Sequence, residues 1–108
     1  MILTNLEFVP GMKTSEFRGL VQGSTVKSKH VGKDIFAGLK NIVGGELKGY
    51  TELMEEARTE ALSRMQQQAT AAGANAVLNI RFATSTITQG AAEILAYGTA
   101  VVLEDELQ

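Results

Sequence analysis

The sequence predicts a single α+β domain in which helices pack on one face of an antiparallel core sheet of three strands, with an additional short strand at the N-terminus. Three observations predict this fold. Residues 16–27 repeat with a period of two, a region with helical periodicity follows, and two further strand-like runs occupy 76–89 and 93–104. The last run is apolar on both of its alternating faces, which predicts a central strand covered on both sides.

The composition is that of an ordinary globular protein, with 44% hydrophobic and 20% charged residues in 108. The formal net charge is -2, so the chain lacks the basic surface that nucleic acid or an anionic membrane would require, and we expect neither as a partner. Because there is no cysteine, disulfides, thiolate zinc sites and cysteine nucleophiles are excluded. No signal-peptide pattern or membrane-length apolar run is present, and we expect a soluble cytoplasmic protein.

The N-terminal third predicts strands. Residues 2–9 alternate loosely and lead to Pro10-Gly11, a pair typical of the central positions of a type II turn. A half-exposed strand is expected over 16–27, with one face formed by Phe17, Gly19, Val21, Gly23 and Thr25.

The middle of the chain predicts two helices. Apolar residues at helical spacing indicate a short helix over 34–43, which Gly44-Gly45 ends. A longer helix is expected over 50–72, with Gly73 as its C′ residue and a Glu60–Arg64 ion pair on its surface. Its apolar stripe consists of Tyr50, Leu53, Met54, Ala57, Ala61, Met65, Ala69 and Ala72.

The last strand, 93–104, is expected between the strands 16–27 and 76–89, and residues 105–108 are expected to form a frayed tail. Helices on one side of this sheet leave the other side bare. A chain of this length cannot supply a second covering layer, so we expect a neighbouring copy to cover that side.

Several short motifs give the chain a resemblance to the YbjQ family of small bacterial and archaeal proteins. They are Gly44-Gly45-Glu46, Tyr50-Thr51-Glu52, Glu56-Ala57-Arg58, Ala61-Leu62, Gly73-Ala74-Asn75-Ala76-Val77, Arg81-Phe82 and Ala96-Tyr97-Gly98-Thr99-Ala100-Val101. They follow one another in order over nearly the whole of residues 1–108, which indicates one YbjQ-like domain.

The resemblance implies a dodecin-subunit-like fold, β-α-β-β, assembled as a homopentamer. It implies little about activity, since the family carries the label "putative heavy-metal-binding" without a motif that can be located here. Where relatives are expected to have an acidic residue after the Arg-Phe pair, this chain has Ala83. A ligand or inter-chain salt bridge that depended on that acid would be absent.

Two sets of charged residues are candidate sites. Glu52, Glu56 and Glu60 recur every four residues on one helix and can in principle chelate a hard cation, although a solvent-facing helix surface explains the same pattern. Lys27, Lys29, His30 and Lys33 cluster where a strand meets a helix, which favours an anion, although exposed loop lysines are the default explanation of such a cluster. The lysine cluster does not match a P-loop.

No catalytic triad or nucleotide-binding motif is present. The sequence therefore predicts a non-enzymatic homo-oligomer that binds a small ligand or a metal ion at its subunit interfaces, and the resemblance implies that this oligomer is a pentamer. The alternative is an enzyme whose active site is shared between subunits and acts on an anionic small molecule near Lys27, Lys29 and Lys33.

Overall fold

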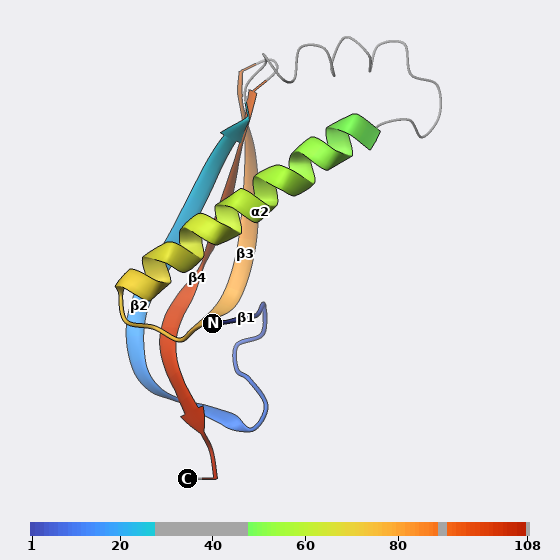
Figure 1. Cartoon of the computed structure of the whole chain (residues 1–108). Coiled ribbons are helices and arrows are strands. Elements are labelled where there is room, and N and C mark those ends of the chain that lie inside the picture. Colours follow the sequence, from blue (N-terminus) through green and yellow to red (C-terminus); the bar gives the residue numbers. More distant parts are fainter. Residues whose placement is uncertain (28–47, 89–90, 108) are drawn as a thin grey trace.

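The structure is a computed structural model that describes residues 1–27, 48–88 and 91–107. Its elements are β1 (Ile2–Leu3), β2 (Met12–Lys27), α2 (Lys48–Ala71), β3 (Ala76–Thr88) and β4 (Ala91–Asp105). The strands form one sheet in the order β1-β3-β4-β2, and α2 runs obliquely across one face of it (Figure 1). The α+β prediction is confirmed, whereas the helix predicted over 34–43 lies outside the described residues.

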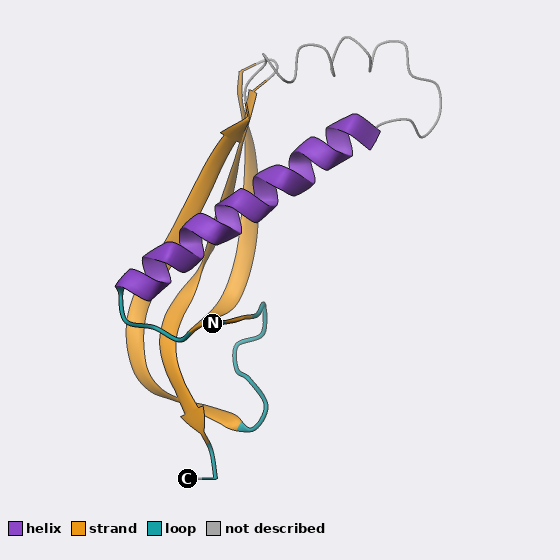
Figure 2. Ribbon diagram, in the orientation of Figure 1, coloured by secondary structure: helices purple, strands orange, loops and turns teal. Residues whose placement is uncertain are grey.

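The sheet has four strands and is mixed. As predicted, β4 lies in the middle, because it pairs antiparallel with both β2 and β3. The short strand β1 pairs parallel with the start of β3, where Ile2 lies opposite Ala76. The N-terminal strand is thus only two residues long, shorter than the run 2–9 suggested, and the residues after it form a loop that leads to β2 (Figure 2).

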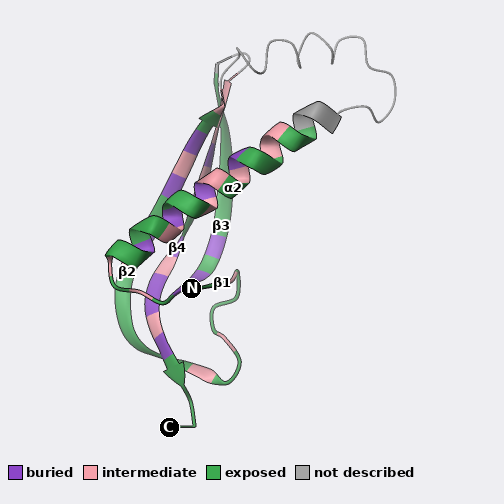
Figure 3. Cartoon of the chain, in the orientation of Figure 1, coloured by how far each residue is buried: buried purple, intermediate pink, exposed green. Residues whose placement is uncertain are grey.

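The main core lies between α2 and the sheet, and its residues are small. A side chain at Gly23 would overlap the backbone of α2 at Ala61 and Met65, so the helix contacts the strand almost directly. Figure 3 shows the buried positions along the side of α2 that faces the sheet. This core comprises Ala57, Ala61, Met65 and Ala69 of α2 with Val21, Val77, Ile80, Ile94, Ala96 and Ala100 of the sheet.

A second, smaller core occupies the opposite face at one end of the sheet. It contains Ala76, Leu78, Val101 and Leu103, against which Val9 and Met12 pack. The predicted turn before β2 is confirmed, since Gly11 has φ 79° and the Met12 N–H donates to the Val9 carbonyl at 3.0 Å. The chain therefore covers part of its second face with its own N-terminal segment. The expectation that a neighbouring copy must cover the whole of that face is wrong at this end.

Bulges move side chains from the face that simple alternation predicts. The register of β2 against β4 shifts between Phe17 and Gly19, so Phe17 lies opposite Val101 while Val21 lies opposite Gly98. Residues 98 and 101 of β4 point to opposite faces. The prediction that Phe17 shares a face with Val21 is therefore wrong, because one inserted residue inverts the alternation.

A second irregularity interrupts β3 next to the N-terminal segment. Asn79 has φ 56° at a register shift between Leu78 and Arg81. Its N–H donates to the Leu6 carbonyl at 2.9 Å, and the Ile80 N–H donates to the Thr4 carbonyl at 3.1 Å. The N-terminal segment thus satisfies backbone groups that the bulge turns away from β4.

The ends of the elements follow local chemistry. Gly73, with φ 83°, is confirmed as the C′ residue of α2, and the Ala74 N–H donates to the Ala69 carbonyl at 3.0 Å as in a Schellman motif. Strand β4 continues through Asp105, which pairs with Met12, so the ordered strand includes the first residue of the predicted tail. In the described part of the chain, no helix is long and apolar enough to cross a membrane.

The contact at Gly23 yields a direct prediction. Gly23→Ala forces a methyl group into the backbone of α2, and overpacking of this kind should lower the free energy of unfolding by about 3 kcal/mol. Gln22→Ala trims the adjacent exposed side chain and should change stability little. Urea unfolding at one fixed protein concentration measures both variants. Equal stability of the two would show that the helix does not approach the strand so closely.

Candidate functional site

The three carboxylates proposed for a metal lie in a row along α2. Glu52 and Glu56 are exposed, and Glu60 is partly buried against the sheet. A rise of 1.5 Å per residue separates Glu52 from Glu60 by about 12 Å along the helix axis, too far for both to bind one ion. Within the described ranges, no group of three or more His, Asp or Glu side chains is placed to hold a metal ion.

An ion pair joins the two candidate sets, with one residue from each. The Lys27 ammonium, at the end of β2, lies 3.1 Å from the Glu60 carboxylate of α2. The predicted Glu60–Arg64 pair is wrong, because Arg64 instead donates through Nη1 to the Ser24 carbonyl at 2.6 Å. Both side chains turn to the strand because α2 lies so close to β2. The positive charge of Lys27 is thereby balanced within the chain.

The remaining members of the anion cluster, Lys29, His30 and Lys33, lie outside the described residues. The described residues therefore test only Lys27 of this candidate site. Ala83, which stands where relatives are expected to carry an acid, is exposed on β3 and lies opposite Leu95.

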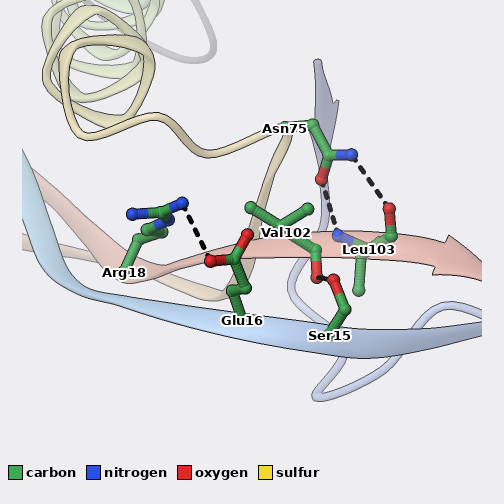
Figure 4. A network of polar contacts seen from close by, with 6 residues as sticks. All are labelled: Ser15, Glu16, Arg18, Asn75, Val102 and Leu103. Carbon is green, nitrogen blue, oxygen red and sulfur yellow. Dashed lines mark hydrogen bonds and ion pairs between the residues drawn. The ribbon is translucent and has the colours of Figure 1, made fainter.

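A polar network joins the strand ends near the C-terminus of α2 (Figure 4). The Asn75 side-chain amide donates to the Leu103 carbonyl at 2.9 Å, and its oxygen accepts from the Leu103 N–H at 2.7 Å. Ser15 donates to the Val102 carbonyl, and Arg18 forms an ion pair with Glu16 at 3.0 Å. The Asn75 side chain thus imitates a strand and extends the pairing of β4. The sequence offered one signal for it, the Gly73-to-Val77 motif.

The sheet face opposite α2 carries exposed apolar side chains, as the sequence predicted for the side that the helices do not cover. We call this surface the open face, and its residues are Phe17, Leu20, Val26, Leu95 and Tyr97. Phe17, Leu20 and Val26 of β2 pair with alternate residues of β4, the same set to which Leu95 and Tyr97 belong. The residues between these on β4 point to the other face, where they contact α2. Phe17 is 74% and Leu20 is 72% exposed. Large exposed apolar patches on folded proteins are typical of interaction sites.

Two charged residues border the open face. Arg81 of β3 lies opposite Tyr97, and Glu93 of β4 lies opposite Val26. Arg81 donates through Nη1 to the Asn5 and Ile80 carbonyls, each at 3.0 Å, which anchors the N-terminal segment beside the open face. Large apolar side chains beside polar and charged ones are a composition that protein interfaces share.

The fold is that of a small α+β domain in which part of one sheet face carries exposed apolar side chains. A family model described as "Putative heavy-metal-binding" (YbjQ) matches residues 1–104. The chain therefore belongs to the YbjQ family, and the resemblance noted in the sequence is confirmed.

Relatives in distant organisms are similar over their whole length. The "UPF0145 protein" of Hahella chejuensis is 66% identical over 104 residues, which cover 96% of this chain and 100% of that protein. The one from Archaeoglobus fulgidus is 58% identical over 103 residues and 95% of each chain. A crystal structure from Pediococcus pentosaceus, titled a protein with unknown function of the DUF74 family, has a TM-score of 0.70 with 12% identity. It covers 96% of this chain and 98% of its own, and supports the fold alone.

The amide of Asn75 should contribute measurably to stability. Asn75→Ala removes both bonds to Leu103 and should cost about 1–3 kcal/mol, because the strand groups lose their partner. Asn75→Asp keeps an acceptor but brings a carboxylate to the Leu103 carbonyl, so it should be destabilised as well. Gln67→Ala, on the exposed side of α2, is the control. Thermal unfolding measures the three variants, and midpoint temperatures equal to that of the wild type for all of them would contradict this role.

Proposed function

We propose that this protein is a non-enzymatic, cytoplasmic subunit of a homo-oligomer, a homopentamer, that binds a small ligand or a metal ion where its subunits meet. The open face is the observation that carries the proposal. A single chain leaves Phe17 and Leu20 in water, although burying one such side chain contributes about 1.5–3 kcal/mol.

The shape of the chain supports the same proposal. Its principal extents are 59 × 25 × 16 Å, and its radius of gyration is 17.4 Å, whereas a compact chain of this length has about 13 Å. A long, thin subunit with an apolar face gains more from association than a compact one, since a larger share of its surface can be removed from water. Self-association needs no other partner, nucleic acid or membrane.

The family resemblance supports the number five. In a ring with an odd number of copies, each copy uses two different surfaces, one toward each neighbour. The chain has such a pair of unlike surfaces, since one face of its sheet carries α2 and the other is open. A fivefold ring also brings five copies of each side chain around one axis.

Ligand binding at the interfaces fits the way the charges are distributed. The described residues of a single copy hold no three-residue group suited to a metal ion, so a metal site in them would take ligands from more than one copy. Those ligands would be carboxylates or imidazole, because the chain has no thiolate. Glu52 and Glu56 are exposed and available for such sharing.

The Lys27–Glu60 ion pair favours this proposal over a shared enzyme active site. An anionic substrate held by Lys27 would have to compete with a carboxylate 3.1 Å from the ammonium. Replacing Lys27, Lys29 and Lys33 together by Ala should therefore leave both the assembly and any co-purifying molecule in place. Loss of the bound molecule with the assembly intact would support the enzyme instead.

Native mass spectrometry of the untagged protein tests the number of copies and the bound ligand or metal ion in one measurement. The expected result is one species of five copies that carries the extra mass of a small molecule or metal. Leu20→Glu should raise the dissociation constant by about a hundredfold or more, because it buries an unpaired charge. Gln67→Glu adds the same charge on the exposed side of α2 and should assemble normally.

The outcomes against the proposal are distinct. A single-copy species at micromolar concentration would reject the assembly. Five bare copies, with no metal found by elemental analysis after dialysis, would reject ligand binding and leave the assembly standing.

A further inference from the structure

We propose that the outer edge of β3, over residues 81–87, is the place where an extended segment of a neighbouring copy of this chain adds a strand to the sheet. We call residues 81–87 the open edge. The inference rests on the proposed assembly and names the surface through which its copies join their backbones.

The open edge is unusually exposed for part of a sheet. Every residue from Arg81 to Ile87 is exposed, and two of them are large apolar side chains, Phe82 at 43% and Ile87 at 57% exposure. The helix explains this exposure, since α2 packs chiefly on β2 and β4 and scarcely reaches β3.

The N-terminal segment covers only the first part of the outer side of β3. Strand β1 pairs with Ala76 and Val77, and the residues after β1 accept from Asn79 and Ile80. Beyond Ile80, the described residues provide no backbone partner on that side of β3. Among the described residues, a row of backbone donors and acceptors without partners therefore begins where the N-terminal segment ends.

The opposite edge of the sheet is protected. On β2, the Gln68 side-chain oxygen accepts from the Gln22 N–H at 2.7 Å, and Arg64 donates to the Ser24 carbonyl. Nearer the start of β2, two bulges and three charged side chains interrupt the edge, those of Lys13, Glu16 and Arg18. Bulges and charges are devices by which proteins keep an edge strand from pairing with another chain.

Between Phe82 and Thr86 the open edge has none of these devices, and its register shift lies at its far end, between Thr86 and Thr88. After Arg81 it reads Phe-Ala-Thr-Ser-Thr-Ile, which combines high strand propensity with no charge, proline or glycine. Such a segment recruits any extended chain if it is left bare, so a native protein keeps it covered. An edge with fewer such devices than the opposite one is the better suited of the two to pair with a specific partner.

A second copy of the chain fits as that partner because the open edge adjoins the open face. Ala83 lies opposite Leu95 on the same side as the open face, so a copy that covers the open face also lies beside this edge. In a ring of five, contacts between copies join unlike surfaces, so the open edge meets a segment of its neighbour other than β3.

The test compares two substitutions of the same kind. Thr86→Lys places a charge on the open edge, whereas Thr70→Lys places it on the exposed side of α2. By light scattering, Thr86→Lys should weaken assembly by about tenfold or more, and Thr70→Lys should not. In the assembled wild type, edge amides within 81–87 should exchange with deuterium about tenfold or more slowly than in dissociated Thr86→Lys protein.

Exchange in the wild type keeps the inference testable if Thr86→Lys fails to fold. Rapid exchange at 81–87 in an assembled wild type would overturn the open edge as a docking site and leave the proposed assembly intact. A single-copy wild type would overturn both. Slow exchange at 81–87 in a single-copy species would assign the edge to a different partner and overturn the inference, and so would equal weakening by the two lysine variants.

Discussion

The close contact between α2 and β2 at Gly23 is the constraint on which the rest of the architecture depends. The facing residues are glycine and alanine, so the backbone of the helix contacts the strand directly. The backbone takes the space that larger side chains occupy in most helix–sheet interfaces. A helix about 10 Å across covers about two strands spaced 4.8 Å apart. It therefore covers β2 and β4 and leaves β3 largely outside its shelter. The same closeness directs Glu60 and Arg64 to the strand.

The face away from α2 divides into a covered and an uncovered part. Val9 and Met12 cover the end of this face near the turn at Gly11, because that turn brings them back onto the sheet. Above that end, the bulge after Phe17 turns an aromatic ring to the open face. The open face is thus exposed because α2 covers only the other side of the sheet and the bulge turns Phe17 away from it. The proposed assembly would remove the open face from water.

Most of the fold could be predicted because periodicity reports which side of an element is buried. The two-sided apolar pattern of 93–104 placed β4 in the middle, and the alanine stripe of 50–72 identified the side of α2 that meets the sheet. Gly73 and Pro10-Gly11 marked the end of a helix and a turn through backbone preference alone. These signals are local, so one sequence contains them.

The features that the sequence did not reveal depend on contacts between distant residues. The residues around Asn79 do not predict a bulge, because the hydrogen bonds that stabilise the bulge come from Thr4 and Leu6, far away in the sequence. Glu60 has one suitable cation four residues along α2, Arg64, and another on β2, Lys27. Only the distance between α2 and β2 decides which of them it pairs with. The candidate site was predicted least well, because charged residues on a helix have the same pattern whether they bind an ion or face solvent.

Cysteine accessibility on the open face tests the central claim most directly, because the native chain has no thiol to interfere. Leu20→Cys places a thiol at a position that is 72% exposed in the single chain, and Thr70→Cys provides an exposed reference on α2. At concentrations where the protein is fully associated, the account predicts that maleimide modifies residue 20 far more slowly than residue 70. Equal rates at both positions would contradict it, since the open face would then be in contact with water.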